Sequence, residues 1–115
     1  MLQVVSTGML LCFLSSILDT RNNSVPRSAI APLAGSCIVC LGVAFGYNTG
    51  FPINPARDFS PRLFLTIAGW GTDVWSAGHH WWWVPIVAPP LGAVAGAFVY
   101  KGAVEAWHPP HNKPS

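Results

Sequence analysis

Charged residues are absent from three long stretches of the chain. These uncharged runs are Met1–Leu18, Ser28–Ala56 and Val74–Tyr100. A helix needs about 20 apolar residues to cross the hydrocarbon core of a bilayer, so each run has room for about one span. The pattern predicts an all-α integral membrane protein with three transmembrane helices, at about residues 1–18, 29–46 and 82–106.

The composition supports a membrane protein. Only 9% of the residues are charged and 51% are hydrophobic, whereas about 25% are charged in an ordinary globular domain. A water-soluble fold does not fit these values. The net charge of +2 is small and scattered, which does not indicate a nucleic-acid-binding protein.

Two residue pairs invite a metal or redox hypothesis. Cys37 and Cys40 have thioredoxin-like spacing, but they lie within an uncharged run, where buried cysteine behaves as a small hydrophobe. His79 and His80 are neighbours whose side chains point apart, and no third ligand is evident. We interpret the histidines as an interfacial polar pair and expect no enzyme activity, metal or cofactor.

Basic residues predict the orientation. Arg21 and Arg27 lie between the first two spans, and Lys101 and Lys113 follow the third. Three spans place these two regions on the same side, which the positive-inside rule assigns to the cytoplasm. The connection over residues 47–80 then starts and ends outside.

The end regions of the third span carry two further signals. Trp81, Trp82 and Trp83 fit an aromatic belt at its outer end. Residues 108–115, which are rich in proline and histidine, are predicted to form a disordered cytoplasmic tail.

Glycine and proline also carry packing signals. Glycines recur at four-residue spacing, at Gly42 and Gly46 and again at Gly92 and Gly96. In lipid, glycine lets helix backbones approach closely, which predicts tight helix packing. The Pro89–Pro90 pair removes backbone donors from the third span, so we expect its regular helix to start only at Pro90.

The centre of the chain combines a helix breaker with charges in an apolar context. Asn54 suits a helix N-cap and Pro55 suits the first helical position, so the pair predicts a helix over residues 54–67. Such a helix is about 20 Å long, too short to cross a core of about 30 Å. A re-entrant half-helix lining a polar cavity fits this length, with Arg57 at the cavity wall.

A simpler interpretation stays open at this point. Asn-Pro is also a common turn signal. Asp58 and Arg62 could then pair with each other in a loop at the membrane interface.

Three stretches resemble one family of channels. "NTGFPINPARDFSPRLF", "AGWG" and "WWWVPIVAPPLGA" are similar to the second half of aquaglyceroporins, a branch of the aquaporin (major intrinsic protein) family. The resemblance extends from "STGMLLC" to about Tyr100. It implies the second inverted repeat of the aquaporin fold, with three transmembrane helices and one re-entrant half-helix.

The resemblance also implies roles for particular residues. Asn54, Pro55 and Ala56 match the second signature motif, and Arg57 matches the selectivity-filter arginine. Phe51 matches a filter position, and Gly42 stands where strict water channels have a histidine, so it implies a wider pore. The markers of the glycerol-permeable branch are Asp58, Arg62 and Pro89.

The implied function is a passive channel for glycerol and water, with urea and other small neutral solutes as further candidates. The resemblance implies a multi-pass protein in the lipid bilayer of the cell membrane and a homotetramer at full length. Because the first repeat has no counterpart in this sequence, we expect a fragment or a truncated product. The alternative is a truncated, non-conducting membrane protein that co-assembles with full-length channels and regulates them.

Overall fold

The computed structural model describes residues 1–21 and 25–108. Of the predicted tail over residues 108–115, all but His108 lies outside the described residues. The described residues form helices joined by turns, which confirms the predicted all-helical class. The helices are α1 (Leu2–Leu18), α2 (Arg27–Thr49), α3 (Pro55–Ile67), α4 (Asp73–His80), η1 (Trp81–Trp83), α5 (Val84–Ala103) and η2 (Glu105–Trp107).

Length and composition allow two helical stretches to cross a bilayer. These are Arg27–Thr49 and Asp73–Trp107, while Leu2–Leu18 is a shorter apolar helix. α2 is longer than the predicted span over residues 29–46, because the helical bonds continue until Gly50 adopts a left-handed conformation (φ 67°) and donates to the Gly46 carbonyl. Glycine takes up this conformation without the steric cost that other residues incur.

The predicted start of the third helix at Pro90 is wrong. α5 begins at Val84, has Pro85 in its first turn, and continues through Pro89 and Pro90. Each internal proline removes one backbone hydrogen bond. However, Ala88 and Pro89 are buried, and packing of a buried helix face stabilises a helix more than local propensity does.

α1 and α5 form the main helix pair, and glycines make their contact close. A Cβ atom built on Gly8 would lie 3.1 Å from the carbonyl oxygen of Gly92. A Cβ atom on Gly92 would overlap the Val4 carbonyl, and one on Gly96 would overlap the Gly8 carbonyl. The predicted packing role of Gly92 and Gly96 is therefore confirmed, whereas nothing among the described residues lies within 4 Å of a Cβ atom on Gly46.

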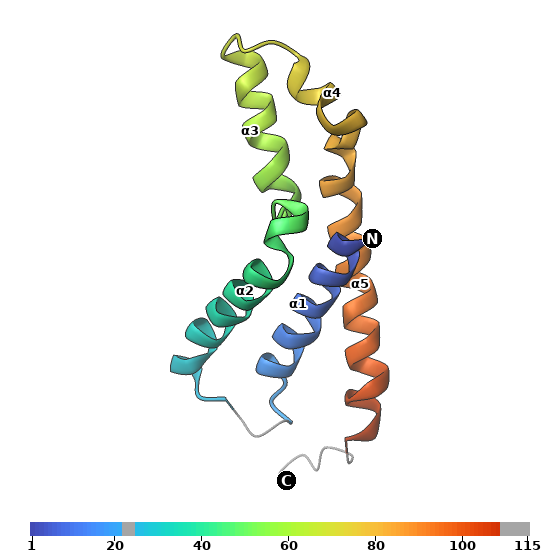
Figure 1. The fold of residues 1–115 in the computed structure, drawn as a ribbon. Coiled ribbons are helices and arrows are strands. Elements are labelled where there is room, and N and C mark those ends of the chain that lie inside the picture. The colour runs from blue at the N-terminus through green and yellow to red at the C-terminus, as the bar shows by residue number, and fades with distance from the viewer. Residues whose placement is uncertain (22–24, 109–115) are drawn as a thin grey trace.

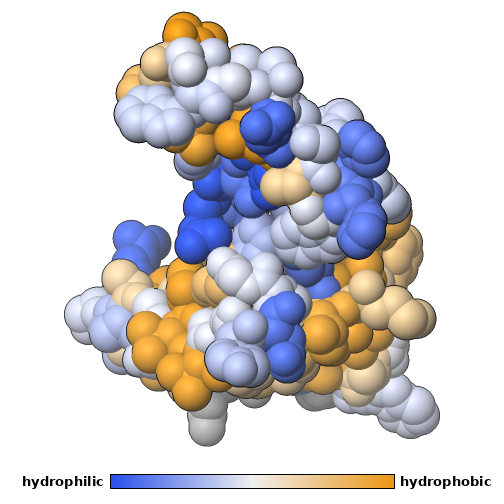
Figure 2. Space-filling view, turned by 45° about the horizontal axis from the view of Figure 1, so that its top comes forward, coloured by the Kyte–Doolittle hydropathy of each residue, from blue (hydrophilic) through white to orange (hydrophobic). Residues whose placement is uncertain are grey.

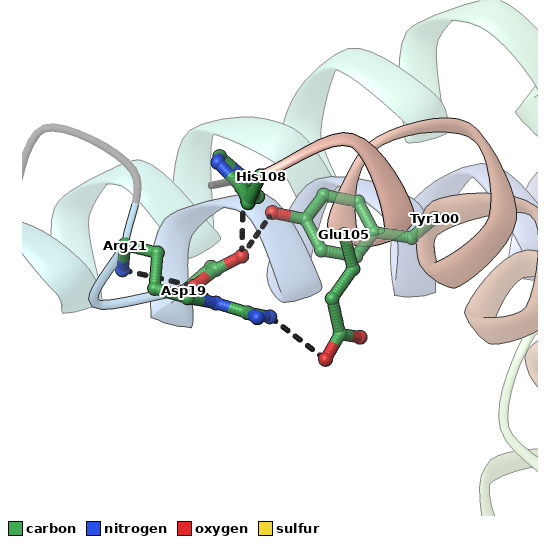
Figure 3. Close-up of polar contacts among 5 residues, drawn as sticks. All are labelled: Asp19, Arg21, Tyr100, Glu105 and His108. Atoms are coloured by element: carbon green, nitrogen blue, oxygen red, sulfur yellow. Dashed lines mark hydrogen bonds and ion pairs between the residues drawn. The ribbon is translucent and has the colours of Figure 1, made fainter. Parts of the chain in front are cut away.

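A polar cluster joins the end of α1 to the end of α5 (Figure 3). The Tyr100 hydroxyl donates to Asp19 Oδ2 over 2.9 Å. The Arg21 guanidinium contacts Asp19 Oδ1 at 3.3 Å and Glu105 Oε1 at 2.7 Å. His108 Nε2 lies 3.6 Å from Asp19 Oδ2, so Asp19 is at the centre of the cluster.

Acid should weaken this cluster. The hydrogen bond from the Arg21 backbone N–H holds the pKa of Asp19 below its ordinary value; burial opposes this, and the Tyr100 hydroxyl and Arg21 guanidinium assist it. The unfolded chain, with a carboxyl pKa of about 3.9, then binds the proton more tightly than the folded chain. The stabilisation is therefore present above about pH 4 and is lost as pH falls through the folded-state pKa.

A pH series of denaturant titrations in detergent micelles would measure this effect. We expect the free energy of unfolding to fall below about pH 4, and Asp19→Asn to abolish the part of the fall that Asp19 supplies. Asp73→Asn, at the first residue of α4 and outside the cluster, is the matched control, in which the part of the fall that Asp19 supplies should persist. An unchanged pH profile in Asp19→Asn would contradict the assignment.

α3 lies beyond the end of α2 and packs against α5 and α4 (Figure 1). The chain is accordingly elongated, with a longest dimension of 63 Å. Figure 2 shows a hollow between the lobe that contains α3 and the helices below it, with hydrophilic residues on part of its wall. Because α3 is not folded back beside α2 in Figure 1, the re-entrant arrangement stays a prediction.

Candidate functional site

The Asn-Pro pair begins α3. Asn54 has an extended backbone (φ −127°, ψ 119°), and its side-chain Oδ1 accepts a hydrogen bond from the Ala56 N–H over 3.0 Å. Pro55 occupies the first helical position, where its missing N–H costs nothing. The pair therefore starts a helix, as the sequence predicts, and the side chain of Asn54 is exposed.

Arg57 lies in the first turn of α3, where its side chain is exposed. Its Nη1 donates to the Gly50 carbonyl over 3.3 Å, and its backbone N–H donates to the Asn54 carbonyl over 3.1 Å. A positive charge near a helix N-terminus opposes the helix dipole, at a cost of about 0.3–1 kcal/mol. Helix stability alone would therefore not favour an arginine here.

Phe51 sits in a strained conformation between α2 and α3. Its φ of 56° lies in the left-handed region, directly after Gly50 at 67°. Such a conformation costs a residue other than glycine about 1–3 kcal/mol and is often associated with functional sites. The Thr49 hydroxyl accepts a hydrogen bond from the Phe51 N–H over 3.1 Å, which holds the strained residue in place.

The ring of Phe51 faces Gly42. A Cβ atom built on Gly42 would lie 3.7 Å from Cε1 of the ring, an ordinary van der Waals distance. Phe51 and Gly42, two of the residues that the family resemblance assigns to a filter, are thus neighbours. The sequence did not predict the roles of Thr49, which binds the Phe51 N–H, and of Gly50, which binds Arg57. The "NTG" at residues 48–50 is a turn signal that could have indicated them.

Asp58 and Arg62 pair with each other on the α4 side of α3. Arg62 Nε donates to Asp58 Oδ2 over 2.7 Å, and Arg62 Nη1 donates to the Val74 carbonyl. The Trp75 indole N–H donates to the Thr66 hydroxyl over 2.8 Å. Both members of the ion pair are mostly buried, with 17% and 19% of their side-chain surface exposed, so the pair connects α3 to α4.

Loss of Arg62 should loosen this connection. Arg62→Met leaves Asp58 and the Val74 carbonyl without their partner, and we expect the free energy of unfolding to fall by about 1–3 kcal/mol. Denaturant titration in detergent micelles measures the change. Arg27→Met, at the exposed start of α2, is the control and should change stability by less than about 0.5 kcal/mol. Equal losses of stability in the two variants would contradict the role of Arg62 in connecting α3 to α4.

Pro89 lies apart from the other branch markers. It is buried in α5 and contributes to a groove of about 410 Å³ that Asn54 and Pro55 also line. The other walls of this groove come from α1 and α2, including Thr7 and Ile38. Pro89 therefore lies near the start of α3, whereas Asp58 and Arg62 lie on its α4 side.

Comparison with known proteins identifies the family. The sequence profile described as "Major intrinsic protein" matches residues 1–100. The chain belongs to the major intrinsic protein family. This confirms the resemblance that the Asn-Pro-Ala stretch carries.

Several relatives in this family are similar to the chain. Human aquaporin-10 (Homo sapiens) is 49% identical over 113 residues, which cover 98% of this chain and 38% of the relative. Rat aquaporin-7 (Rattus norvegicus) is 47% identical over 94% of this chain and 40% of the relative. Human aquaporin-9 is 45% identical over 93% of this chain and 36% of the relative. These relatives are aquaglyceroporins, and the chain spans about two fifths of their length.

Proposed function

We propose that this major intrinsic protein chain forms the second half of a passive channel for glycerol, water and other small neutral solutes. The observation that carries the proposal is the start of α3, where Asn54 caps the helix and Arg57 is held by the Gly50 carbonyl. Asn54 and Arg57 are both exposed, and the Gly50 carbonyl that binds Arg57 directly precedes apolar Phe51. Such a surface hydrogen-bonds hydroxyl groups and packs against carbon.

The charges at this site favour neutral solutes. Arg57 carries a full positive charge, and the N-terminus of α3 adds a partial one. In aquaporin-type pores an arginine and the positive ends of half-helices exclude protons and cations. The unfavourable position of Arg57 for helix stability is explained if its charge serves this barrier.

The proposal requires α3 to act as a re-entrant half-helix. At 13 residues it is about 20 Å long, too short to span a bilayer, and its start would lie within the membrane when the first repeat is present. In this arrangement Asp58 and Arg62 stand behind the lining and hold the loop. The completed channel would be a homotetramer in the cell membrane.

A chimaeric channel tests the proposal. Residues 1–107 of this chain replace the corresponding half of human aquaporin-10, and stopped-flow light scattering follows the swelling of liposomes in glycerol. We expect the chimaera to conduct water and glycerol, and Asn54→Leu to reduce both fluxes because the amide no longer binds solute oxygens. A chimaera that inserts and folds but conducts neither solute would refute the proposal.

A second candidate, a non-conducting subunit that co-assembles with full-length channels, is compatible with the exposed surface of α2. In the most apolar 18-residue stretch of α2, only 6% of the residues are buried within the structure. This helix therefore presents a large apolar surface that a partner chain or lipid has to cover. Reconstitution of the 115-residue polypeptide alone tests the second candidate, since glycerol flux without a partner chain would contradict it.

A further inference from the structure

The Thr49 hydroxyl forms two hydrogen bonds at the end of α2. It donates to the Phe45 carbonyl, one helical turn earlier, over 2.8 Å. It also accepts the Phe51 N–H over 3.1 Å. Because a hydroxyl group has only one proton to donate, the bond to Phe45 fixes the direction of the O–H and leaves its lone pairs for Phe51.

The Phe51 N–H belongs to the same peptide group that holds Arg57. This group joins Gly50 to Phe51, and its carbonyl, that of Gly50, accepts a hydrogen bond from Arg57 Nη1 over 3.3 Å. The peptide bond is trans, so its planar N–H and C=O point in opposite directions. Thr49 therefore binds one edge of the peptide group and Arg57 binds the other, and a rotation of the group would break both bonds.

Local preferences of the chain oppose this orientation of the peptide group. Phe51 has a left-handed backbone with a φ of 56°, which is strained for a residue other than glycine. Pro52 follows it, and a residue that precedes proline prefers an extended backbone with a φ of about −120°. The hydrogen bond from Phe51 to Thr49 thus acts against two preferences that would turn the peptide group away.

The same backbone conformation sets the position of the Phe51 ring. The ring lies 3.7 Å from where a Cβ atom on Gly42 would be. One hydroxyl group is therefore connected to both parts of the candidate site. It reaches the charged part through the Gly50 carbonyl and the apolar part through the Phe51 backbone.

We propose that Thr49 is a positioning residue for solute selection, an inference that rests on the proposed function. Its hydroxyl orients the Gly50–Phe51 peptide group, and this group holds the Arg57 guanidinium and the Phe51 ring in a fixed relation to each other. A polyol needs both surfaces, because it has hydroxyl groups and carbon atoms. Water needs only the hydrogen-bonding groups, so Thr49 acts on the ratio of glycerol flux to water flux.

A second threonine provides a matched control. The Thr66 hydroxyl donates to the Arg62 carbonyl over 3.0 Å and accepts the Trp75 indole N–H over 2.8 Å. This is the same pair of roles, a bond donated to the carbonyl four residues earlier and a bond accepted from an N–H. It connects α3 to α4 near the other end of α3 from Arg57, so its loss should affect stability and not the choice of solute.

Flux measurements in the chimaeric channel test the proposal. Thr49→Val keeps the shape of the side chain but removes the hydroxyl, and we expect the ratio of glycerol to water flux to fall about threefold, a small change in the barrier. Thr49→Ala, which removes the same hydroxyl with a smaller side chain, should also lower the ratio. Thr49→Ser keeps the hydroxyl and should restore the ratio, and Thr66→Val should leave it unchanged.

Amide hydrogen exchange tests the positioning step directly. In the 115-residue chain in detergent micelles, NMR measures the exchange rate of the Phe51 amide proton. We expect Thr49→Val to raise this rate about tenfold, the factor that one ordinary hydrogen bond supplies. Thr49→Ser and Thr66→Val should keep the rate of the unsubstituted chain.

The outcomes separate this inference from the proposed function. A conducting chimaera whose flux ratio stays the same in both Thr49→Val and Thr49→Ala would overturn the inference and leave the channel function intact. A Phe51 amide proton that exchanges equally fast with and without the Thr49 hydroxyl would overturn it as well. An unsubstituted chimaera that folds but conducts neither solute would refute the proposed function, and this inference with it.

Discussion

Gly96→Ala should destabilise the chain by about 1–3 kcal/mol, the usual cost of forcing an extra group into a packed interface. The new methyl group would overlap the carbonyl oxygen of Gly8 on the opposing helix. Its nearest neighbours there are backbone atoms, which cannot rotate aside as a flexible side chain can. α1 and α5 would have to move apart, and the buried residues along their contact would lose van der Waals contacts. Denaturant titration in detergent micelles measures the loss.

Gly102→Ala is the matched control on the same helix. No described atom lies within 4 Å of a Cβ atom at position 102. In a helix without such contacts, alanine is more stable than glycine by about 0.5–1 kcal/mol. The same chemical change should therefore have opposite signs at the two positions. If both variants were stabilised, the close approach of α1 and α5 would be wrong.

The start of α3 could be predicted from the sequence because its chemistry is local. An asparagine cap needs only the N–H two residues later, and a proline at the first helical position needs only its own fixed φ. The structure has this bond, from the Ala56 N–H to the Asn54 side chain, and the helix ends at Ile67, as the sequence predicts. The pairing of Asp58 with Arg62 is also local, at helical i, i+4 spacing.

Contacts between distant segments could not be predicted in this way. The Tyr100–Asp19 hydrogen bond joins residues 81 positions apart, and no local pattern selects that pair. The continuation of α5 through Pro89 and Pro90 depends on burial against other helices, which local propensity does not include. The amide of Gln3 has no hydrogen-bond partner within residues 1–21 and 25–108, and this likewise becomes evident only when its neighbours are known.

The placement of α3 relative to the other helices is a third case. The sequence predicts a short helix at membrane depth, and the described chain has α3 beyond the end of α2. The irregular segment that leads into a re-entrant helix has backbone N–H and C=O groups at membrane depth, which surrounding helices have to bury or hydrogen-bond. The chain spans about two fifths of the length of its curated relatives: 38% of human aquaporin-10 and 40% of rat aquaporin-7. Local signals define the short helix, whereas the membrane depth that the sequence predicts for it depends on the rest of the bundle.

In the chimaeric channel, Gly42→His should reduce glycerol flux by about tenfold and water flux by much less. The substituted Cβ would already be in van der Waals contact with the Phe51 ring, at 3.7 Å, so the imidazole has to occupy space beside that ring. Phe51 cannot move away freely, because Thr49 binds its N–H and its backbone is held in the left-handed region. A tenfold effect requires only about 1.4 kcal/mol of additional barrier, which is within reach of a steric obstruction that a smaller solute avoids.

Gly46→His provides the control for this prediction, one turn further along α2. A Cβ atom at position 46 meets nothing within 4 Å in the described part of the chain, although the substitution adds the same side chain to the same helix. We expect Gly46→His to leave the ratio of glycerol to water flux unchanged in stopped-flow measurements. Equal losses of glycerol and water flux in Gly42→His would mean that the histidine disturbs folding or blocks the path for every solute. A changed flux ratio at position 42 alone would instead locate the discrimination between solutes at the contact of Gly42 with Phe51, since that contact is the difference between the two glycines.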